Sequence, residues 1–180
     1  MLGEVLSRCK LIPGIDEVVC AVPDTSENDL LAELASTYVS VSRGPEHDVL
    51  RRYRLAAEVF RASIIMRITA DCPLLSPELC GQVLKSLIKS KADYASNIEP
   101  RTFPQGFDCE AFTMETLQRA DEESTEREHV TTWMRQSKIK RVNVKSPWPL
   151  DGRLTLDTWD DYATICAAFG HSAEQYLRVA

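Results

Sequence analysis

The 180-residue sequence lacks any hydrophobic run long enough to cross a membrane, and no signal peptide precedes its first expected helix. Its six cysteines are scattered and form no C-x-x-C pair, and its three histidines lie far apart. Neither a disulfide framework nor a zinc site of common ligand spacing is therefore indicated, and reduced thiols suit the cytosol. We expect a cytoplasmic protein that does not enter a membrane.

The sequence also lacks an excess of positive charge. Its 27 acidic and 21 basic residues leave a net charge of −6, which argues against a protein that binds nucleic acid through phosphate contacts. One basic cluster lies within residues 138–145, where apolar residues alternate with the basic ones. That alternation predicts a strand with a solvated basic face rather than a nucleic-acid site.

Two glycine-rich signatures are missing as well. No G-x-G-x-x-G is present, so a dinucleotide-dependent dehydrogenase is excluded as far as sequence allows. No G-x-x-x-x-G-K-[ST] is present either, so nothing indicates a P-loop site for phosphates.

Strand and helix patterns alternate through the first half of the chain. Short apolar segments rich in β-branched residues predict strands at residues 17–22, 38–41 and 63–68. Amphipathic helices are predicted around them, over residues 1–10, from about residue 27, and over 47–60 and 77–87. This alternation predicts a single α/β domain over residues 1–180, with a mainly parallel mixed sheet and helices on both faces.

The pattern changes after residue 92. We predict further strands at residues 93–98, 107–112, 138–145 and 153–156, with helices at 113–123 and 127–136. Thr158 would cap another helix, and Ser172 opens a capping box for a final short one. The length and an apolar fraction of 44% suffice for one domain with a real core.

Two of the predicted strands lead into an aspartate. Asp71 follows the buried strand at 63–68 and precedes a helix that Ser76 would cap, while Asp157 follows the strand at 153–156. Ligands of open α/β sheets bind at the carboxyl ends of strands, and two carboxylates there would suit magnesium beside phosphates. The alternatives are that Asp71 is a turn residue and that Asp157 belongs to the cap of the following helix.

Six short segments, in one order, carry a family resemblance. They read RGPEHDVLRRY from Arg43, RITADCPLL from Arg67, DYASN from Asp93, RTFPQGFDCEAF from Arg101, REHVT from Arg127 and RLTLDTWDDY from Arg153. The series resembles the spore-coat polysaccharide biosynthesis family, relatives of the cytidylyltransferases that activate acylneuraminate and deoxy-octulosonate sugars. This resemblance implies a nucleotide-diphospho-sugar transferase (GT-A-like) fold. It also implies a Mg²⁺-dependent transfer of a nucleotide from CTP to an acidic sugar, with release of pyrophosphate, by a homodimer.

The resemblance assigns roles residue by residue. The metal-binding and catalytic aspartates match Asp71 and Asp157. The nucleotide side matches Arg43, Asp48, Arg51 and Arg67. The sugar side matches Arg101, Asp108, Glu110, Arg127, Glu128 and His129. Purely structural interpretations stay open, with Arg51 on a helix surface, Asp108 and Glu110 on a solvated strand face, and His129 in helix packing.

One departure from the family pattern affects the chemistry. The family opens with a strand and a loop similar to A-R-x-x-S-T-R-L-P-x-K, which holds the triphosphate, whereas residues 1–6 match the helix after that loop. We therefore expect the first strand and loop of the family to be missing from this chain. Since the departing pyrophosphate needs cationic and N–H partners, we expect the chain as written to be a poor catalyst.

Two other functions remain open. The missing loop favours a non-catalytic module that binds a sugar nucleotide or a partner on the same fold, although the pair of metal aspartates argues for chemistry. A metal-dependent glycosyltransferase could use Asp108-Cys109-Glu110 as its acidic motif. That function is less favoured, because the tripeptide lies within a predicted strand rather than in the turn after one.

Overall fold

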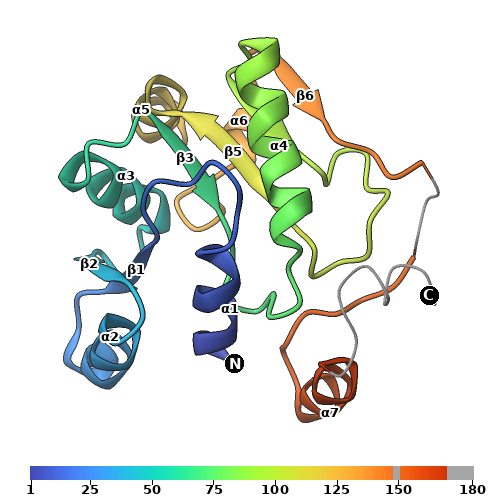
Figure 1. Cartoon of the computed structure of the whole chain (residues 1–180). Coiled ribbons are helices and arrows are strands. Elements are labelled where there is room, and N and C mark those ends of the chain that lie inside the picture. The colour runs from blue at the N-terminus through green and yellow to red at the C-terminus, as the bar shows by residue number, and fades with distance from the viewer. Residues whose placement is uncertain (148–150, 170–180) are drawn as a thin grey trace.

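The computed structural model describes residues 1–147 and 151–169, and shows a two-stranded and a four-stranded sheet with helices packed on them (Figure 1). The helix expected from Ser172 lies outside the described residues. Within them, no helix combines the length and the apolar character needed to cross a membrane.

The first sheet consists of two parallel strands. After α1 (Leu2–Cys9), β1 (Val19–Pro23) pairs with β2 (Ser40–Gly44), and their connection passes through η1 (Ser26–Asn28) and α2 (Asp29–Ser36). Such a crossover is required because parallel neighbours cannot be joined by a tight turn. Both strands were predicted, and each begins two residues later than expected, at residues 19 and 40.

The second sheet is mixed and has the strand order β3-β5-β4-β6. Its strands are β3 (Ile64–Arg67), β4 (Tyr94–Ser96), β5 (Glu110–Thr113) and β6 (Arg141–Asn143). β6 runs parallel to β4, whereas β5 runs antiparallel to both β3 and β4. The predicted α/β class is confirmed, with less parallel pairing than expected. A loop rather than a helix joins β4 to β5, so β5 returns in the opposite direction.

Helices cover both faces of this second sheet, as predicted (Figure 1). One face packs against α1 and α4 (Pro77–Ser90), and the other against α3 (Val49–Val59), α5 (Met114–Glu123) and α6 (Thr132–Gln136). Because side chains alternate along a strand, Ile64 and Met66 of β3 face α4, while Ile65 faces α3. The α4 cap is also as predicted, since the Ser76 hydroxyl accepts the Leu79 N–H at 3.3 Å.

The segment before α7 (Trp159–Ala168) differs from the prediction. The expected strand at residues 153–156 does not form, and its only ladder contact among the described residues is an isolated bridge between Arg153 and Gln105. The Leu154 N–H donates to the Gln105 carbonyl at 2.7 Å, and the Leu154 side chain is buried. Burial of Leu154 with Ile165 of α7, rather than sheet pairing, therefore places this segment.

Two of the edge strands in the described ranges, β1 and β3, belong to different sheets, and each has one unpaired side. β1 pairs only with β2, and β3 pairs only with β5. The two edges belong to one packed unit, because Val18 beside β1 and Ile64 of β3 both pack against the cluster that holds Val5 of α1. Unpaired edges expose backbone N–H and C=O groups that another strand can use.

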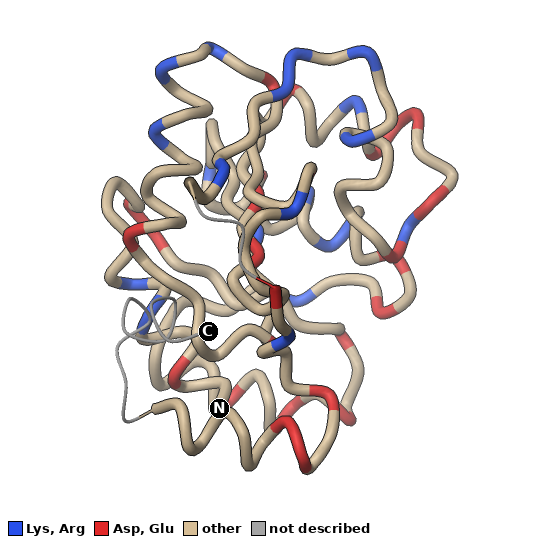
Figure 2. The backbone as a smooth tube through the Cα atoms, turned by 90° about the vertical axis from the view of Figure 1, so that its right-hand side faces the viewer, with Lys and Arg blue, Asp and Glu red and all other residues tan. Residues whose placement is uncertain are grey.

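The basic residues predicted to form a solvated strand face are exposed as expected: Lys138, Lys140, Arg141 and Lys145. Only residues 141–143 of this segment pair as a strand. Lys and Arg gather at one end of the molecule, whereas Asp and Glu predominate at the opposite end (Figure 2).

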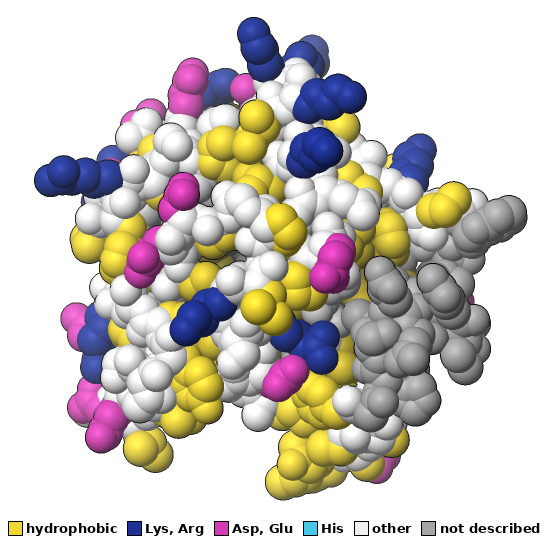
Figure 3. Space-filling view, viewed as in Figure 1, with side chains coloured by type: hydrophobic (Ala, Val, Ile, Leu, Met, Phe, Trp, Pro, Cys, Tyr) yellow, Lys and Arg dark blue, Asp and Glu magenta, His cyan; other side chains and the backbone are white. Residues whose placement is uncertain are grey.

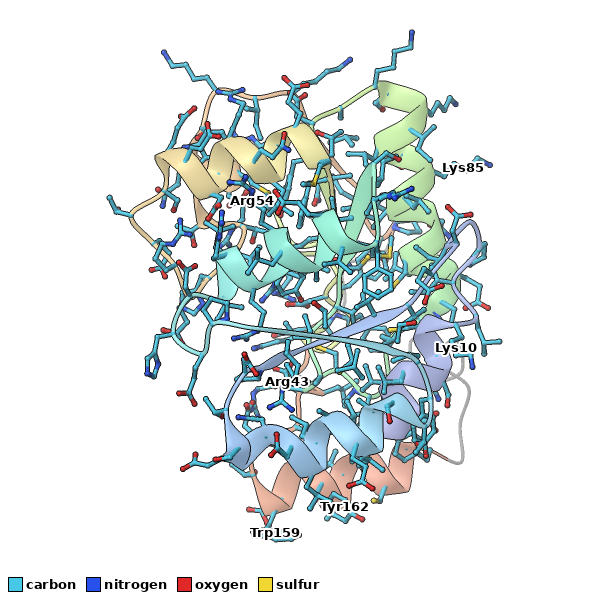
Figure 4. All side chains as sticks on the ribbon, turned by 90° about the vertical axis from the view of Figure 1, so that its left-hand side faces the viewer. Lys10, Arg43, Arg54, Lys85, Trp159 and Tyr162 are labelled. Atoms are coloured by element: carbon cyan, nitrogen blue, oxygen red, sulfur yellow. The ribbon has the colours of Figure 1, made fainter. Side chains whose placement is uncertain are left out.

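An ion-pair cluster joins α3 to α5 and to the chain before α6. Arg51 and Arg54 of α3 each donate to Oδ2 of Asp121 at 2.8 Å, and Arg127 donates to the same carboxylate. Arg127 also donates to Oδ2 of Asp48, the N-cap residue of α3, at 3.0 Å. Figure 4 shows Arg54 between the two helices. Burial opposes the charge of Asp121, but the three arginines outweigh it and hold its pKa below the ordinary value.

We predict that Asp121→Asn destabilises the protein by roughly 2–3 kcal/mol near neutral pH, because three arginines lose a shared buried acceptor. A lowered folded-state pKa stabilises the protein above the unfolded pKa of about 3.9, and this contribution is lost as the pH falls through the folded pKa. The gap between Asp121→Asn and wild type should therefore shrink below about pH 4. Urea unfolding between pH 3 and pH 7 measures this gap.

The matched control is Glu122→Gln, since Glu122 is the exposed neighbour of Asp121 on α5. It should leave stability almost unchanged at every pH. Equal losses in the two variants would show that net charge, and not the arginine cluster, is responsible.

We also predict that Gly106→Ala costs roughly 2–4 kcal/mol, because it combines backbone strain with a backbone clash. Gly106 has a φ of +103°, and a Cβ there would lie 2.6 Å from the Leu154 carbonyl oxygen. Gly152→Ala isolates the strain, since Gly152 has a φ of +138° but the nearest atom to its Cβ would be 3.8 Å away. Chemical denaturation should show that Gly106→Ala is much less stable than Gly152→Ala. Equal stabilities of the two variants would contradict the predicted clash.

Candidate functional site

Asp71 lies in the turn between β3 and α4, as the sequence predicted. Its carboxylate is half-buried and accepts the Cys72 thiol, with 3.6 Å between Sγ and Oδ1. The Thr69 hydroxyl contacts the same thiol at 3.3 Å, so the Cys72 thiol links two side chains of this turn. No other described side chain donates to the Asp71 carboxylate, which leaves oxygen lone pairs available for a ligand.

Asp157 lies beside Asp71, although it does not end a strand. The Leu156 N–H donates to the backbone carbonyl of Asp71 at 2.8 Å, and this bond brings the two aspartates together. The Asp157 side chain is 54% exposed and accepts from Arg153, and from the Thr155 hydroxyl at 3.0 Å. Its carboxylate therefore retains an open side.

The capping box of α7 uses Thr158 and Asp161, so the carboxylate of Asp157 is not part of the cap. Asp161 accepts the Asp157 N–H at 2.9 Å and the Arg153 guanidinium at 2.7 Å. These two interactions lower the pKa of Asp161 to about 2. The cap therefore holds Asp157 in place through its backbone and leaves its carboxylate free for other interactions.

A hollow with an aromatic wall adjoins Asp157. Its lining residues are Met1, Leu156, Asp157, Thr158, Trp159 and Tyr162. The rings of Trp159 and Tyr162 meet edge to face at 5.9 Å, and 86% of Trp159 is exposed. Both rings lie on α7, where hydrophobic side chains reach the surface (Figures 3 and 4).

The donor chemistry of Asp71 and Asp157 fits a divalent cation such as Mg²⁺, because both offer hard carboxylate oxygens with open lone pairs. No group of three or more metal-ligating side chains occurs in the part of the chain that the structure describes. A cation held here would therefore need phosphate or water oxygens to complete its shell, which is how Mg²⁺ is usually bound at nucleotide sites.

A buried polar network lies on the α3 face of the second sheet. Arg67 at the end of β3 donates to Oε2 of Glu110 at 2.7 Å, and the Tyr94 hydroxyl donates to Oε1 at 2.5 Å. Glu110 is 2% exposed, so its two oxygens are both occupied and sealed from solvent. Burial opposes the charge of Arg67, but Tyr53 and Glu110 raise its pKa overall. Glu110 therefore positions Arg67, and the alternative of a solvated strand face does not apply to Glu110.

Asp108 forms a two-pronged pair with Arg101, with distances of 2.6 and 2.8 Å. The pair lies on the Asp71 side of the domain: burial raises the pKa of the Cys72 thiol to about 12, and the nearby carboxylates of Asp71 and Asp108 add to the rise. The hydrogen bonds to Asp108 raise the pKa of Arg101 against the opposing effect of burial, and the Glu110 carboxylate adds to the rise. The structure thus groups Arg67, Asp71, Arg101, Asp108 and Glu110.

The remaining predicted residues have partners elsewhere or lie at the surface. Arg43 pairs with Asp29 at 2.7 Å and Asp24 at 3.2 Å, which ties β2 to the start of α2. The arginine cluster around Asp121 contains the predicted residues Asp48, Arg51 and Arg127. Two exposed residues follow that cluster, Glu128 and His129. His129 is therefore not a packing residue, and Arg51 is not a free surface residue.

Sequence reasoning missed two residues that support the site. Asn97 is 1% exposed, donates to the Phe107 carbonyl at 2.7 Å and accepts the Cys109 N–H at 2.9 Å, so it fixes the chain on both sides of Asp108. Tyr94 fixes Glu110. Both residues belong to the DYASN segment. The signal available in the sequence was a predicted strand that ends in an asparagine, whose amide could be buried.

The sequence matches a family model described as "Cytidylyltransferase" over residues 1–162. An uncharacterized protein of Methanocaldococcus jannaschii is 33% identical over 171 residues, covering 90% of this chain and 69% of that protein. The spore coat polysaccharide biosynthesis protein SpsF of Bacillus subtilis is 29% identical over 167 residues, covering 89% of this chain and 70% of that protein.

Solved structures give the same family context. A cytidylyltransferase from Leptospira borgpetersenii superposes with a TM-score of 0.93 at 28% identity, covering 99% of this chain and 81% of that one. A CMP:2-keto-3-deoxy-manno-octonic acid synthetase complexed with CTP shares the fold, with a TM-score of 0.65 at 13% identity and coverage of 94% and 87%. With a family model spanning residues 1–162 and the M. jannaschii relative at 33% identity, the chain belongs to the cytidylyltransferase family.

Proposed function

We propose that this chain activates an acidic sugar for surface polysaccharide synthesis, by transferring a cytidine nucleotide from CTP to a sugar hydroxyl with release of pyrophosphate. The observation that supports the proposal is the Leu156–Asp71 backbone hydrogen bond, which brings the backbone of the segment carrying Asp157 next to Asp71. The family membership and the polysaccharide role in the name of the SpsF relative support the substrate class.

In this mechanism Asp71 and Asp157 would hold Mg²⁺, which would neutralise the negative charge that develops as the sugar hydroxyl attacks the α-phosphorus. Arg67 would contact the nucleotide, and its hydrogen bond to Glu110 would hold its guanidinium in orientation. The paired Arg101 and Asp108 would present both a cation and a carboxylate to the hydroxyl-rich sugar. Positioning of this kind is most of what phosphoryl transfer asks of a protein.

The leaving pyrophosphate needs further donors. Near Asp71 and Asp157, the arginines at positions 67, 101 and 153 already have carboxylate partners. The unpaired edges of β1 and β3 offer a place where an additional strand could pair and bring a phosphate-binding loop. We propose that full activity requires such a strand and loop.

We predict that joining the amino-terminal strand and loop of a family member to residue 1 raises turnover at least a hundred-fold, because each preorganised phosphate donor contributes about a hundred- to a thousand-fold in rate. Turnover is measured as the release of pyrophosphate from CTP in the presence of an acidic nonulosonate. Equal rates would show that the described residues hold the triphosphate themselves, and no turnover in either form would favour the non-catalytic binding module.

We further predict that Asp71→Asn and Asp157→Asn each lower turnover of the extended form by about a hundred- to a thousand-fold. Calorimetry on the chain as written adds a readout without catalysis, since both variants should also lose the Mg²⁺-dependent part of CTP binding. Asp160→Asn is the matched control, because Asp160 is an exposed carboxylate in the first turn of α7. If Asp157→Asn behaves like this control, the metal role of Asp157 is wrong.

A further inference from the structure

The end of the molecule that carries the amino ends of β4 and β6 is strongly basic. Five exposed lysines, which we call the lysine patch, lie on the second half of α4, just after it, and between α6 and β6: Lys85, Lys89, Lys91, Lys138 and Lys140. Lys140 joins the two segments, because its ammonium group donates to the Ser90 carbonyl at 2.5 Å. Basic side chains accordingly gather at the top of the molecule, over the end of α4 (Figure 3).

The charge of the lysine patch is not neutralised by the part of the protein that the structure describes. None of the five ammonium groups forms an ion pair with a described carboxylate. Asp93 accepts the backbone N–H of Lys140 at 2.7 Å rather than an ammonium group, and Glu99 lies 3.8 Å from the neighbouring Arg141. Like charges that lie together repel one another, so an anionic partner outside the chain would relieve this repulsion.

Two structural roles explain parts of the lysine patch. Lys89 lies in the last turn of α4, where a cation offsets the helix dipole. Lys138 and Lys140 precede β6, whose outer side is an unpaired edge, and charged residues there discourage pairing with another chain. Neither role requires the two sets of lysines to lie together, and neither explains an exposed isoleucine among them.

That isoleucine is Ile88, which is 57% exposed and lies on α4 one turn after Lys85 and directly before Lys89. Its backbone carbonyl accepts the N–H of Lys91 at 3.1 Å. An apolar side chain flanked by lysines suits an anionic lipid surface, because the apolar group can enter the acyl boundary while the ammonium groups contact the headgroups. Nucleic acids are instead bound largely through arginine forks and aromatic stacking, and the lysine patch contains neither group.

The lysine patch lies at the opposite end of the second sheet from Asp71. β3, β4 and β6 run in one direction, since β5 is antiparallel to β3 and β4 and β6 is parallel to β4. Lys91 and Lys140 precede β4 and β6, whereas Asp71 follows β3. A contact through the lysine patch would therefore leave the candidate site open to the solution. The acidic end of the molecule would be screened from this contact, because the Debye length is about 8 Å at physiological salt.

We propose that the lysine patch docks this protein onto the anionic headgroups of a membrane surface, with Ile88 entering the boundary of the acyl chains. This docking is separate from nucleotide transfer and does not depend on the proposed reaction. Each lysine near an anionic leaflet contributes about five-fold in affinity, so the five together would give reversible binding that weakens as salt is raised.

The test is sedimentation of the chain with vesicles of phosphatidylcholine and phosphatidylglycerol in a ratio of about 3:1, compared with vesicles of phosphatidylcholine alone. Wild type should bind only the mixed vesicles, and raising NaCl from about 0.05 M to about 0.5 M should release it. Lys89→Gln and Lys138→Gln should each weaken binding about five-fold, and the double variant about twenty-five-fold. Ile88→Ser should weaken binding about ten-fold without changing its dependence on salt.

Lys10→Gln is the matched control, because Lys10 is an exposed lysine at the end of α1, outside the lysine patch (Figure 4). This variant should bind the mixed vesicles as wild type does, and an equal loss in it would show that net charge, not the patch, is responsible. Equal binding to both kinds of vesicle, or binding to neither, also overturns the proposal. So does binding to duplex DNA in place of vesicles, which would make the partner a nucleic acid. Lowered thermal stability of the patch variants with unchanged vesicle binding would leave the lysines only their structural roles.

Discussion

One backbone hydrogen bond, from the Leu156 N–H to the Asp71 carbonyl, sets the geometry on which the proposed chemistry depends. Alone, such a bond contributes only about 1 kcal/mol. It persists because Leu154 and Ile165 are buried in the same apolar cluster, so that hydrophobic packing presses the segment before α7 against the turn after β3. Gly106 permits this approach, since any side chain there would meet the Leu154 carbonyl. The metal-binding potential of the site is thus a product of packing.

The charged side chains around the site are mostly paired. Arg67 with Glu110 and Arg101 with Asp108 form fixed pairs whose orientation needs no adjustment when a substrate arrives. The carboxylates of Asp71 and Asp157 retain oxygen lone pairs for a cation, although Asp157 also accepts from Arg153 and Thr155.

Some of the predicted functional residues lie at the candidate site, and others belong to the arginine cluster on α3 and α5. Arg51 and Arg127 were expected to contact ligands, yet both donate to Asp121. This cluster fixes α3 relative to α5, and its Asp48 caps α3. Its effect on catalysis is therefore expected to be indirect, through the placement of the helices that cover the site.

Local signals in the sequence determined much of this protein. The β-branched run at 63–68, the Ser76 cap and the acid between them were enough to place Asp71 in the turn after a buried strand, because hydrophobic period and capping act within a few residues. Only the tertiary structure decided that the segment carrying Asp157 reaches Asp71 without forming a strand, and that Glu110 is buried with both oxygens occupied. These features arise from contacts between segments far apart in the chain, and such contacts leave no pattern in the residues next to them.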